Sequence, residues 1–90
     1  MTTDSITEIL DLREVESSQQ HHLFLRAFLA LTPGEAFLLQ TSRDPDGLLY
    51  PIRLIYAGEM EVRVKPPVQG IWSTIVRRRA LTGRLGRVSI

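Results

Sequence analysis

The run from Glu59 to Lys65 constrains the fold most strongly, because it alternates strictly between charged and apolar residues. Successive side chains of a β-strand point to opposite faces of a sheet, so this run predicts a strand with one buried and one solvent-facing side. The side chains expected to face the core are Met60, Val62 and Val64. The Pro-Pro pair at 66–67 ends the strand and, with the charged side, indicates a sheet edge.

Residues 17–31 have the spacing of an amphipathic helix. Four apolar side chains follow the i, i+3, i+4, i+7 rule and form one stripe for the core, namely Phe24, Ala27, Phe28 and Leu31. Ser17 and Gln20 fit a capping box, in which each side chain satisfies a free backbone donor at the helix start. The Pro-Gly pair at 33–34 ends this helix.

Two leucines of this helix, Leu25 and Leu29, lie outside the stripe and one turn apart. An apolar pair on the outer side of a helix is typical of a contact with a partner or with a second copy of the chain. We therefore expect Leu25 and Leu29 to form the interface of a homodimer through the first helix. Packing under a neighbouring loop is the alternative that the spacing leaves open.

Three further segments rich in apolar residues predict strands, at positions 6–13, 35–41 and 71–77. The first of these suits a buried strand. The second has apolar side chains on both faces, which indicates a central strand. Trp72 and Tyr50 are expected in the core or at its edge.

A second helix is predicted from Asp44 to Gly58. Asp44 suits the N-cap, and Pro45 suits the first helical position. Pro51 lies beyond the first turn and is expected to kink or shorten the helix. The element order is therefore β-α-β-α-β-β, in which right-handed crossovers place both helices on one face of the sheet.

The composition limits the chain to one small domain without cysteine chemistry. Its 90 residues suffice for one core and are too few for two. The absence of Cys rules out disulfides, thiolate metal sites and thiol nucleophiles. No apolar run could span a membrane and no secretory signal is recognisable, so we expect a cytoplasmic protein. We expect a frayed end at 1–5, the domain at 6–79 and a basic tail at 80–90.

The charge is unevenly distributed along the chain. Residues 1–46 hold eight acids and three bases, whereas residues 47–90 hold two acids and eight bases. Arg77, Arg78 and Arg79 begin the most basic part. Such a surface could bind the phosphates of RNA, which is one alternative function, or it could be a solvated strand end. We expect no membrane partner.

Several residues between positions 8 and 79 follow a recognisable order: Leu10-Asp11-Leu12-Arg13, His21, Phe28, Leu31, Pro33-Gly34-Glu35, Asp44-Pro45, Leu48, Tyr50, Gly58 and Trp72. In these residues the chain resembles the family called domain of unknown function 2249, which is itself similar to the sulfur carrier TusA and the SirA-like proteins. The resemblance implies an α+β two-layer sandwich, with two helices on one face of a four-stranded mixed sheet.

The chain departs from these relatives at positions that carry their chemistry. TusA-like carriers have a Cys-Pro pair where this chain has Ser17 and Ser18. A hydroxyl cannot carry a persulfide, so we expect no sulfur-relay activity. The family pattern has a His at the position of His21 and another where this chain has Arg43. An accessory role in redox or nitrogen-oxide metabolism, with His21 binding a metal or haem, is the second alternative.

The leading hypothesis is a non-catalytic module that binds a protein partner or a ligand. The carboxyl ends of the first two strands should meet at one edge of the sheet, beside the start of the first helix. The residues expected to bind there are Arg13, Ser17, His21, Arg43 and Asp44. No arrangement of nucleophile, base and oxyanion donors is recognisable, so we expect no enzyme activity and no resident cofactor.

Overall fold

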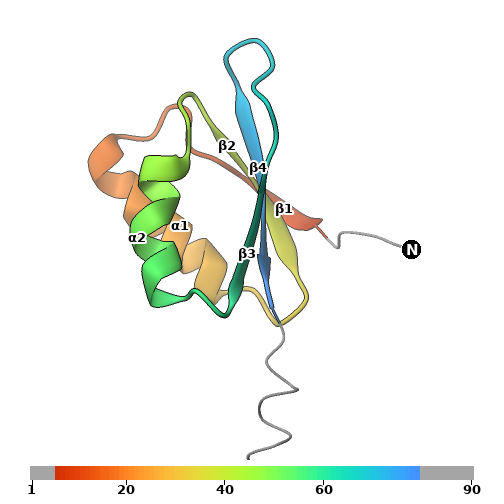
Figure 1. Cartoon of the computed structure of the whole chain (residues 1–90). Helices are drawn as coiled ribbons and strands as arrows, with labels where there is room; N and C mark the ends of the chain where they lie inside the picture. Colours follow the sequence, from red (N-terminus) through yellow and green to blue (C-terminus); the bar gives the residue numbers. More distant parts are fainter. Residues whose placement is uncertain (1–5, 80–90) are drawn as a thin grey trace, which may run out of the picture.

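Within residues 6–79, which the computed structural model describes, four strands and two helices follow the predicted order β-α-β-α-β-β. The elements are β1 (Ile6–Asp11), α1 (Ser17–Leu29), β2 (Ala36–Thr41), α2 (Asp46–Ile55), β3 (Met60–Val64) and β4 (Trp72–Arg78). Both helices lie on the same face of the sheet (Figure 1). The expectations for residues 1–5 and 80–90 concern parts of the chain outside the described residues.

The strands form one mixed sheet in the order β1-β2-β4-β3. β1 pairs in parallel with β2, while β4 runs antiparallel to both β2 and β3. β2 is therefore central and β3 forms an edge, as their side-chain patterns predict. Because β1 and β2 are parallel, their carboxyl ends meet at one edge of the sheet, which positions the candidate site.

The core fills the space between the helices and the sheet. Its buried side chains include Phe24, Phe28, Leu48, Leu49 and Ile52 from the helices and Phe37, Leu39 and Val76 from the strands. The rings of Phe24 and Phe37 meet edge to face, with centroids 5.6 Å apart. The ring of Phe28 packs against Tyr56 at the far end of α2, with centroids 5.5 Å apart. The predicted apolar stripe of α1 is thus the face that packs.

The prediction of a buried first strand is wrong. Ile6 and Ile9 of β1 are exposed, because the sheet order places β1 at an edge and the helices cover only one face. In β3, Met60 is buried and Val62 is half-buried, as predicted. Val64 is exposed instead, because it ends an edge strand.

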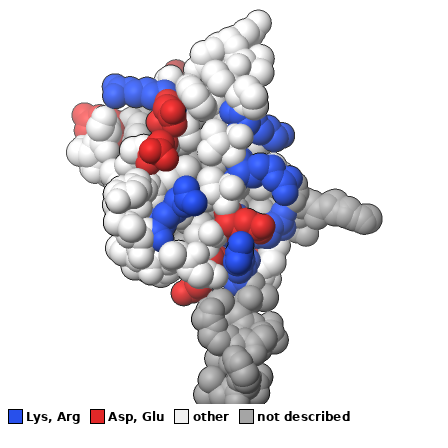
Figure 2. Space-filling view, in the orientation of Figure 1, with Lys and Arg blue, Asp and Glu red and all other residues white. Residues whose placement is uncertain are grey.

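The uncovered face of the sheet is rich in charged side chains. Glu61 and Arg63 of β3 lie beside Arg77 and Ile75 of β4, and Arg77 Nε is 3.6 Å from Glu61 Oε1. Figure 2 shows Lys and Arg groups gathered along this side, at the right of the view. The expected solvent-facing side of β3 is therefore confirmed.

α2 continues through Pro51 and ends at Ile55, before the predicted end at Gly58. The ring of Pro51 removes one backbone donor, and this loss falls in the second turn, where the helix can still continue. Pro51 therefore does not end α2, and the helix is shorter than the predicted range at both of its ends.

The two aromatic residues expected at the core have different surroundings. Trp72 is half-buried at the start of β4, whereas Tyr50 is exposed. The buried residues Leu49 and Ile52 define the inner side of α2, and Tyr50 lies on its outer side. The expectation for Tyr50 is therefore wrong, because its side chain lies on the outer side of α2.

Candidate functional site

A cavity of about 320 Å³ lies at the sheet edge where β1 and β2 end. It is lined by the loop after β1, the start of α1, the end of β2 with its following loop, and the first turn of α2. Its lining includes all five residues that the sequence singles out for binding: Arg13, Ser17, His21, Arg43 and Asp44. The fold thus brings together residues that are far apart in the sequence.

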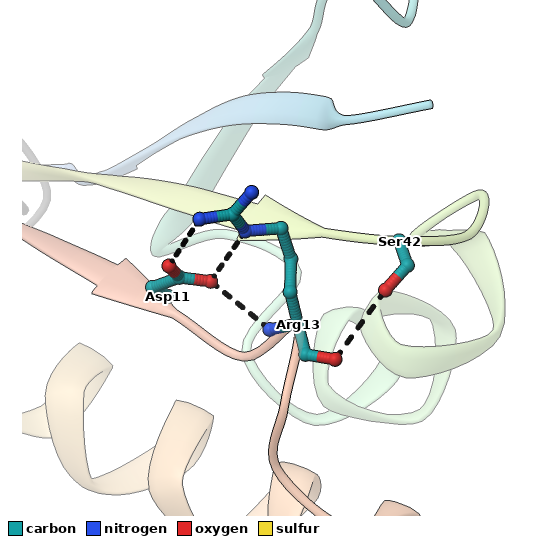
Figure 3. Close-up of polar contacts among 3 residues, drawn as sticks. All are labelled: Asp11, Arg13 and Ser42. Atoms are coloured by element: carbon teal, nitrogen blue, oxygen red, sulfur yellow. Dashed lines mark hydrogen bonds and ion pairs between the residues drawn. The ribbon is translucent and has the colours of Figure 1, made fainter. Parts of the chain in front are cut away.

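An ion pair holds the chain where it leaves β1. The Arg13 guanidinium donates to the Asp11 carboxylate from Nε at 2.9 Å and from Nη2 at 2.7 Å, and the Arg13 backbone N–H donates at 3.0 Å. The Ser42 hydroxyl donates to the Arg13 carbonyl at 3.4 Å (Figure 3). These contacts join the loop after β1 to the end of β2, so two walls of the cavity are linked.

The pair changes the acidity of its carboxyl group. Hydrogen bonds from the guanidinium and the backbone N–H of Arg13 lower the pKa of Asp11 to about 2. The same contact with the Asp11 carboxylate raises the pKa of Arg13. Both side chains are exposed to solvent, so the pair positions the loop more than it stabilises the fold.

We expect the ionised Asp11 carboxylate to contribute to stability in a defined pH range. Its pKa is lower in the folded than in the unfolded chain, so the contribution is complete above about pH 4 and is lost as the pH falls towards 2. Carboxyl ¹³C NMR titration should give a pKa of about 2 for Asp11 and a higher pKa in Arg13→Gln. Arg43→Gln is the matched control and should leave the Asp11 pKa unchanged. The same Asp11 pKa in the wild type and Arg13→Gln would contradict this assignment.

Gln20 ties the start of α1 to the loop after β1. Its Nε2 donates to the carbonyl of Leu12 at 3.2 Å and to that of Val15 at 2.9 Å. The N-cap residue is Glu16, and its side chain makes no capping hydrogen bond. The predicted capping box of Ser17 and Gln20 is therefore wrong, because the Gln20 side chain bonds the preceding loop instead.

The loop between β2 and α2 is held by its own side chains. Thr41 Oγ1 donates to the carbonyl of Arg43 at 2.8 Å, and the backbone N–H of Asp46 donates to Asp44 Oδ1 at 3.0 Å. α2 begins at Asp46 with Pro45 at the N-cap, one residue later than predicted. The Asp44 carboxylate still satisfies a free N–H at the start of the helix.

Hydrogen-bond donors outnumber acidic groups around the cavity. The guanidinium groups of Arg13 and Arg43 and the imidazole of His21 line it, and among the described lining residues Asp44 alone is acidic. Arg13 is paired with Asp11, whereas Arg43 is exposed and has no side-chain hydrogen bond or ion pair within residues 6–79. The first turn of α1 also lies at the cavity and contains no acidic residue. Because helix N-termini carry partial positive charge, the surroundings favour an anionic group.

His21 is exposed near the start of α1. Within residues 6–79, no group of three or more His, Asp or Glu side chains lies close enough together to hold a metal ion. The described residues therefore supply no cluster of ligands that would support the hypothesis that His21 binds a metal or haem.

Only one of the two leucines expected at an interface is exposed. Leu29 is at the surface, whereas Leu25 is half-buried and packs against the core. Leu25 follows the fully buried Phe24 and lies on the flank of α1 that is covered. Of the two, Leu29 alone is therefore at the surface, and an interface through α1 stays a prediction.

The three consecutive arginines at the end of β4 do not form one basic surface. Arg77 donates to the carbonyl of Gly34 at 3.1 Å and pairs with Glu61 on the uncovered face. Arg78 turns to the opposite face and donates to carbonyls at the end of α1. Arg79 is exposed. Successive side chains of a strand point to opposite faces, so the three guanidinium groups are separated. The basic surface available to RNA is therefore smaller than three consecutive arginines predict.

Sequence reasoning missed the polar groups that complete the cavity, chiefly Gln20, Thr41 and Ser42. Thr41 and Ser42 lie at the carboxyl end of a strand predicted to be central. This position in the sequence could have indicated that they line the cavity. The hydrogen bonds of Gln20 give no local sequence signal, because they depend on the path of the loop after β1.

The fold and the cavity define a small α+β domain, with two helices on one face of a four-stranded sheet. The chain belongs to the family described as uncharacterized conserved protein (DUF2249), which matches residues 9–78. The resemblance to this family seen in the sequence is therefore confirmed. Neither helix within residues 6–79 is long and apolar enough to cross a membrane.

The chain was also compared with individual proteins. No curated protein matches it. Among solved structures, it is similar to the solution structure of HP1264 from Helicobacter pylori, with a TM-score of 0.65 and 18% sequence identity. The similarity covers 82% of this chain and 100% of that chain, and at this identity it concerns the fold alone.

Proposed function

We propose that the protein is a non-catalytic module that binds a small ligand with an anionic group in the cavity where β1 and β2 end. The observation that carries this proposal is the lining, which collects Arg13, Ser17, His21, Arg43 and Asp44 around one hollow. Its volume of about 320 Å³ lies at the lower end of the range for small-molecule sites.

The cavity offers complementary donors for a carboxylate or a phosphate. Arg43 presents a planar guanidinium that can donate two parallel hydrogen bonds to either group. His21 and Ser17 supply further donors from the first turns of α1. Asp44 is engaged by the backbone of α2 and keeps that wall in place.

The polar contacts support binding rather than catalysis. Among the described residues, no hydrogen bond links the Ser17 hydroxyl to His21 or to Asp44. A serine nucleophile needs an oriented base and donors for the oxyanion. The Ser17 hydroxyl also lacks the chemistry of a persulfide carrier.

We expect inorganic phosphate and citrate to shift the backbone amide NMR signals of residues 17–21 and 41–47 in a saturable manner. Arg43→Ala should weaken the binding of at least one of these anions about tenfold, as expected when one charge-assisted hydrogen bond is lost. His21→Ala should weaken it less, because an imidazole offers the anion one hydrogen bond whereas a guanidinium can offer two parallel ones. An uncharged sugar of similar size should give no saturable shifts.

Arg53→Ala is the matched control, because Arg53 is an exposed arginine of α2 that does not line the cavity. This variant should bind as the wild type does. The proposal fails if neither anion shifts the cavity signals, or if Arg53→Ala weakens binding as much as Arg43→Ala. The second result would indicate a general attraction of anions to a basic chain.

A further inference from the structure

We infer that the outer side of α2 docks a second copy of this chain and forms a weak two-fold symmetric dimer. Several large apolar side chains exposed together on one helix are typical of a contact with a partner. The inner side of α2 is covered, since Leu49 and Ile52 are buried. Its outer side is not, since Tyr50, Leu54 and Ile55 are 60%, 65% and 73% exposed.

These outer residues form a continuous patch. Tyr50 and Leu54 lie one turn apart, and so do Pro51 and Ile55, which places the four side chains next to one another. Within residues 6–79, three of the eight exposed large hydrophobic side chains belong to this ten-residue helix, so they are concentrated rather than scattered.

The charges of α2 favour a second copy as the occupant. Asp46, Tyr50 and Arg53 have the i, i+4, i+7 spacing that places them on one side of the helix, with the acid in the first turn and the base in the last. Neither Asp46 nor Arg53 has a side-chain ion pair within residues 6–79. The side of α2 that carries Tyr50 therefore has this ring at its centre and an acid and a base towards its two ends.

An antiparallel copy satisfies both ends at once. Across a two-fold axis, Arg53 faces Asp46 of the second copy, and Asp46 faces Arg53 of the second copy, with both Tyr50 rings near the axis. The two charges are separated by about 10.5 Å along α2, and the same separation recurs in the copy because the surface is its own partner. A surface with one sign of charge could not pair with itself in this way.

The size of the patch sets the strength of the contact. Four side chains of one short helix cover much less than the roughly 800 Å² per partner found in stable complexes. The dimer is therefore weak and forms at high protein concentration. It differs from the homodimer expected from the sequence, because α2 and not α1 presents the apolar surface.

Sedimentation equilibrium of the full chain between about 20 µM and about 1 mM tests the dimer in the range of a weak interface. The average mass of the wild type should rise from monomer towards dimer across this range. Leu54→Glu should stay monomeric throughout. Ile9→Glu is the matched control, because Ile9 is equally exposed but lies on β1, and it should associate as the wild type does.

A charge exchange tests the antiparallel geometry. Asp46→Arg alone places like charges opposite each other at both ends of the contact, and so does Arg53→Asp alone, so each variant should be monomeric. A mixture of the two variants restores opposite charges at both ends and should associate about tenfold more tightly than either variant alone. Amide NMR spectra of each variant verify that it is folded.

Three results would overturn the inference. The first is a wild-type chain that is monomeric at the highest concentration. The second is a Leu54→Glu variant that dimerises like the wild type. The third is a mixture of the charge variants that associates no better than its components, which would exclude the antiparallel arrangement even if a dimer forms.

Discussion

Phe28→Ala is expected to remove a large part of the domain's free energy of unfolding. The Phe28 side chain is fully buried between α1 and the sheet, where its ring packs against Tyr56 and lies 5.5 Å from the guanidinium carbon of Arg78. Truncation of a buried Phe typically costs about 4 kcal/mol, because contacts are lost and a cavity remains. A chain of this length has a total free energy of unfolding of roughly 5 to 13 kcal/mol. Urea denaturation followed by Trp72 fluorescence measures the loss.

The matched control is Tyr50→Ala, which removes an exposed aromatic ring from the outer side of α2. At low protein concentration this change should alter the free energy of unfolding by less than about 0.5 kcal/mol, as is usual for surface sites. Phe28→Leu should cost less than Phe28→Ala, since it retains most of the apolar volume. A loss for Phe28→Ala as small as that for Tyr50→Ala would contradict the assigned core.

The spacing of apolar residues predicted the helices and strands of this fold, but it did not predict which strands lie at the edges of the sheet. The stripe through Phe24 and Phe28 identified α1, and the alternation after Glu59 identified an edge strand. The apolar run containing Ile6 and Ile9 was interpreted as a buried strand, although it lies at an edge. Side-chain spacing reports which side of a strand is apolar, and it does not report which strands lie beside it.

The candidate site was predictable where it depends on topology. Arg13 and Arg43 follow two strands that are joined by a crossover, so their meeting at one sheet edge follows from the predicted order. The contacts of Gln20 were not predictable, because they depend on how the loop after β1 folds back. The exposure of Leu54 was not predictable either, since an apolar residue on a helix gives no sign of which side lacks a cover.

The role of Arg78 was not predictable from the sequence either, because its neighbours Arg77 and Arg79 suggest a run of solvent-exposed arginines. Its Nη1 donates to the carbonyls of Leu29 at 3.2 Å and Leu31 at 3.0 Å, and its Nη2 is 3.3 Å from Glu59 Oε1. Carbonyls at the end of a helix lack intrahelical donors and carry partial negative charge. The guanidinium therefore closes the end of α1 against β4.

We expect Arg78→Met to lower the free energy of unfolding by about 2 kcal/mol, because hydrogen bonds from a charged donor to the carbonyls of Leu29 and Leu31 are lost. Arg78→Lys should recover only part of this loss, since an ammonium group cannot reproduce the fork of a guanidinium. Urea denaturation of the variants at one ionic strength measures both effects.

Arg79→Met is the matched control, because Arg79 is the next residue, has the same charge and is exposed. It should change the free energy of unfolding by less than about 0.5 kcal/mol. Equal effects of Arg78→Met and Arg79→Met would contradict the structural role of Arg78. A larger loss for Arg78→Met than for Arg79→Met would show that the Arg78 guanidinium holds the end of α1. Such a guanidinium is not available to a phosphate, so a nucleic-acid surface at the end of β4 would lack this charge.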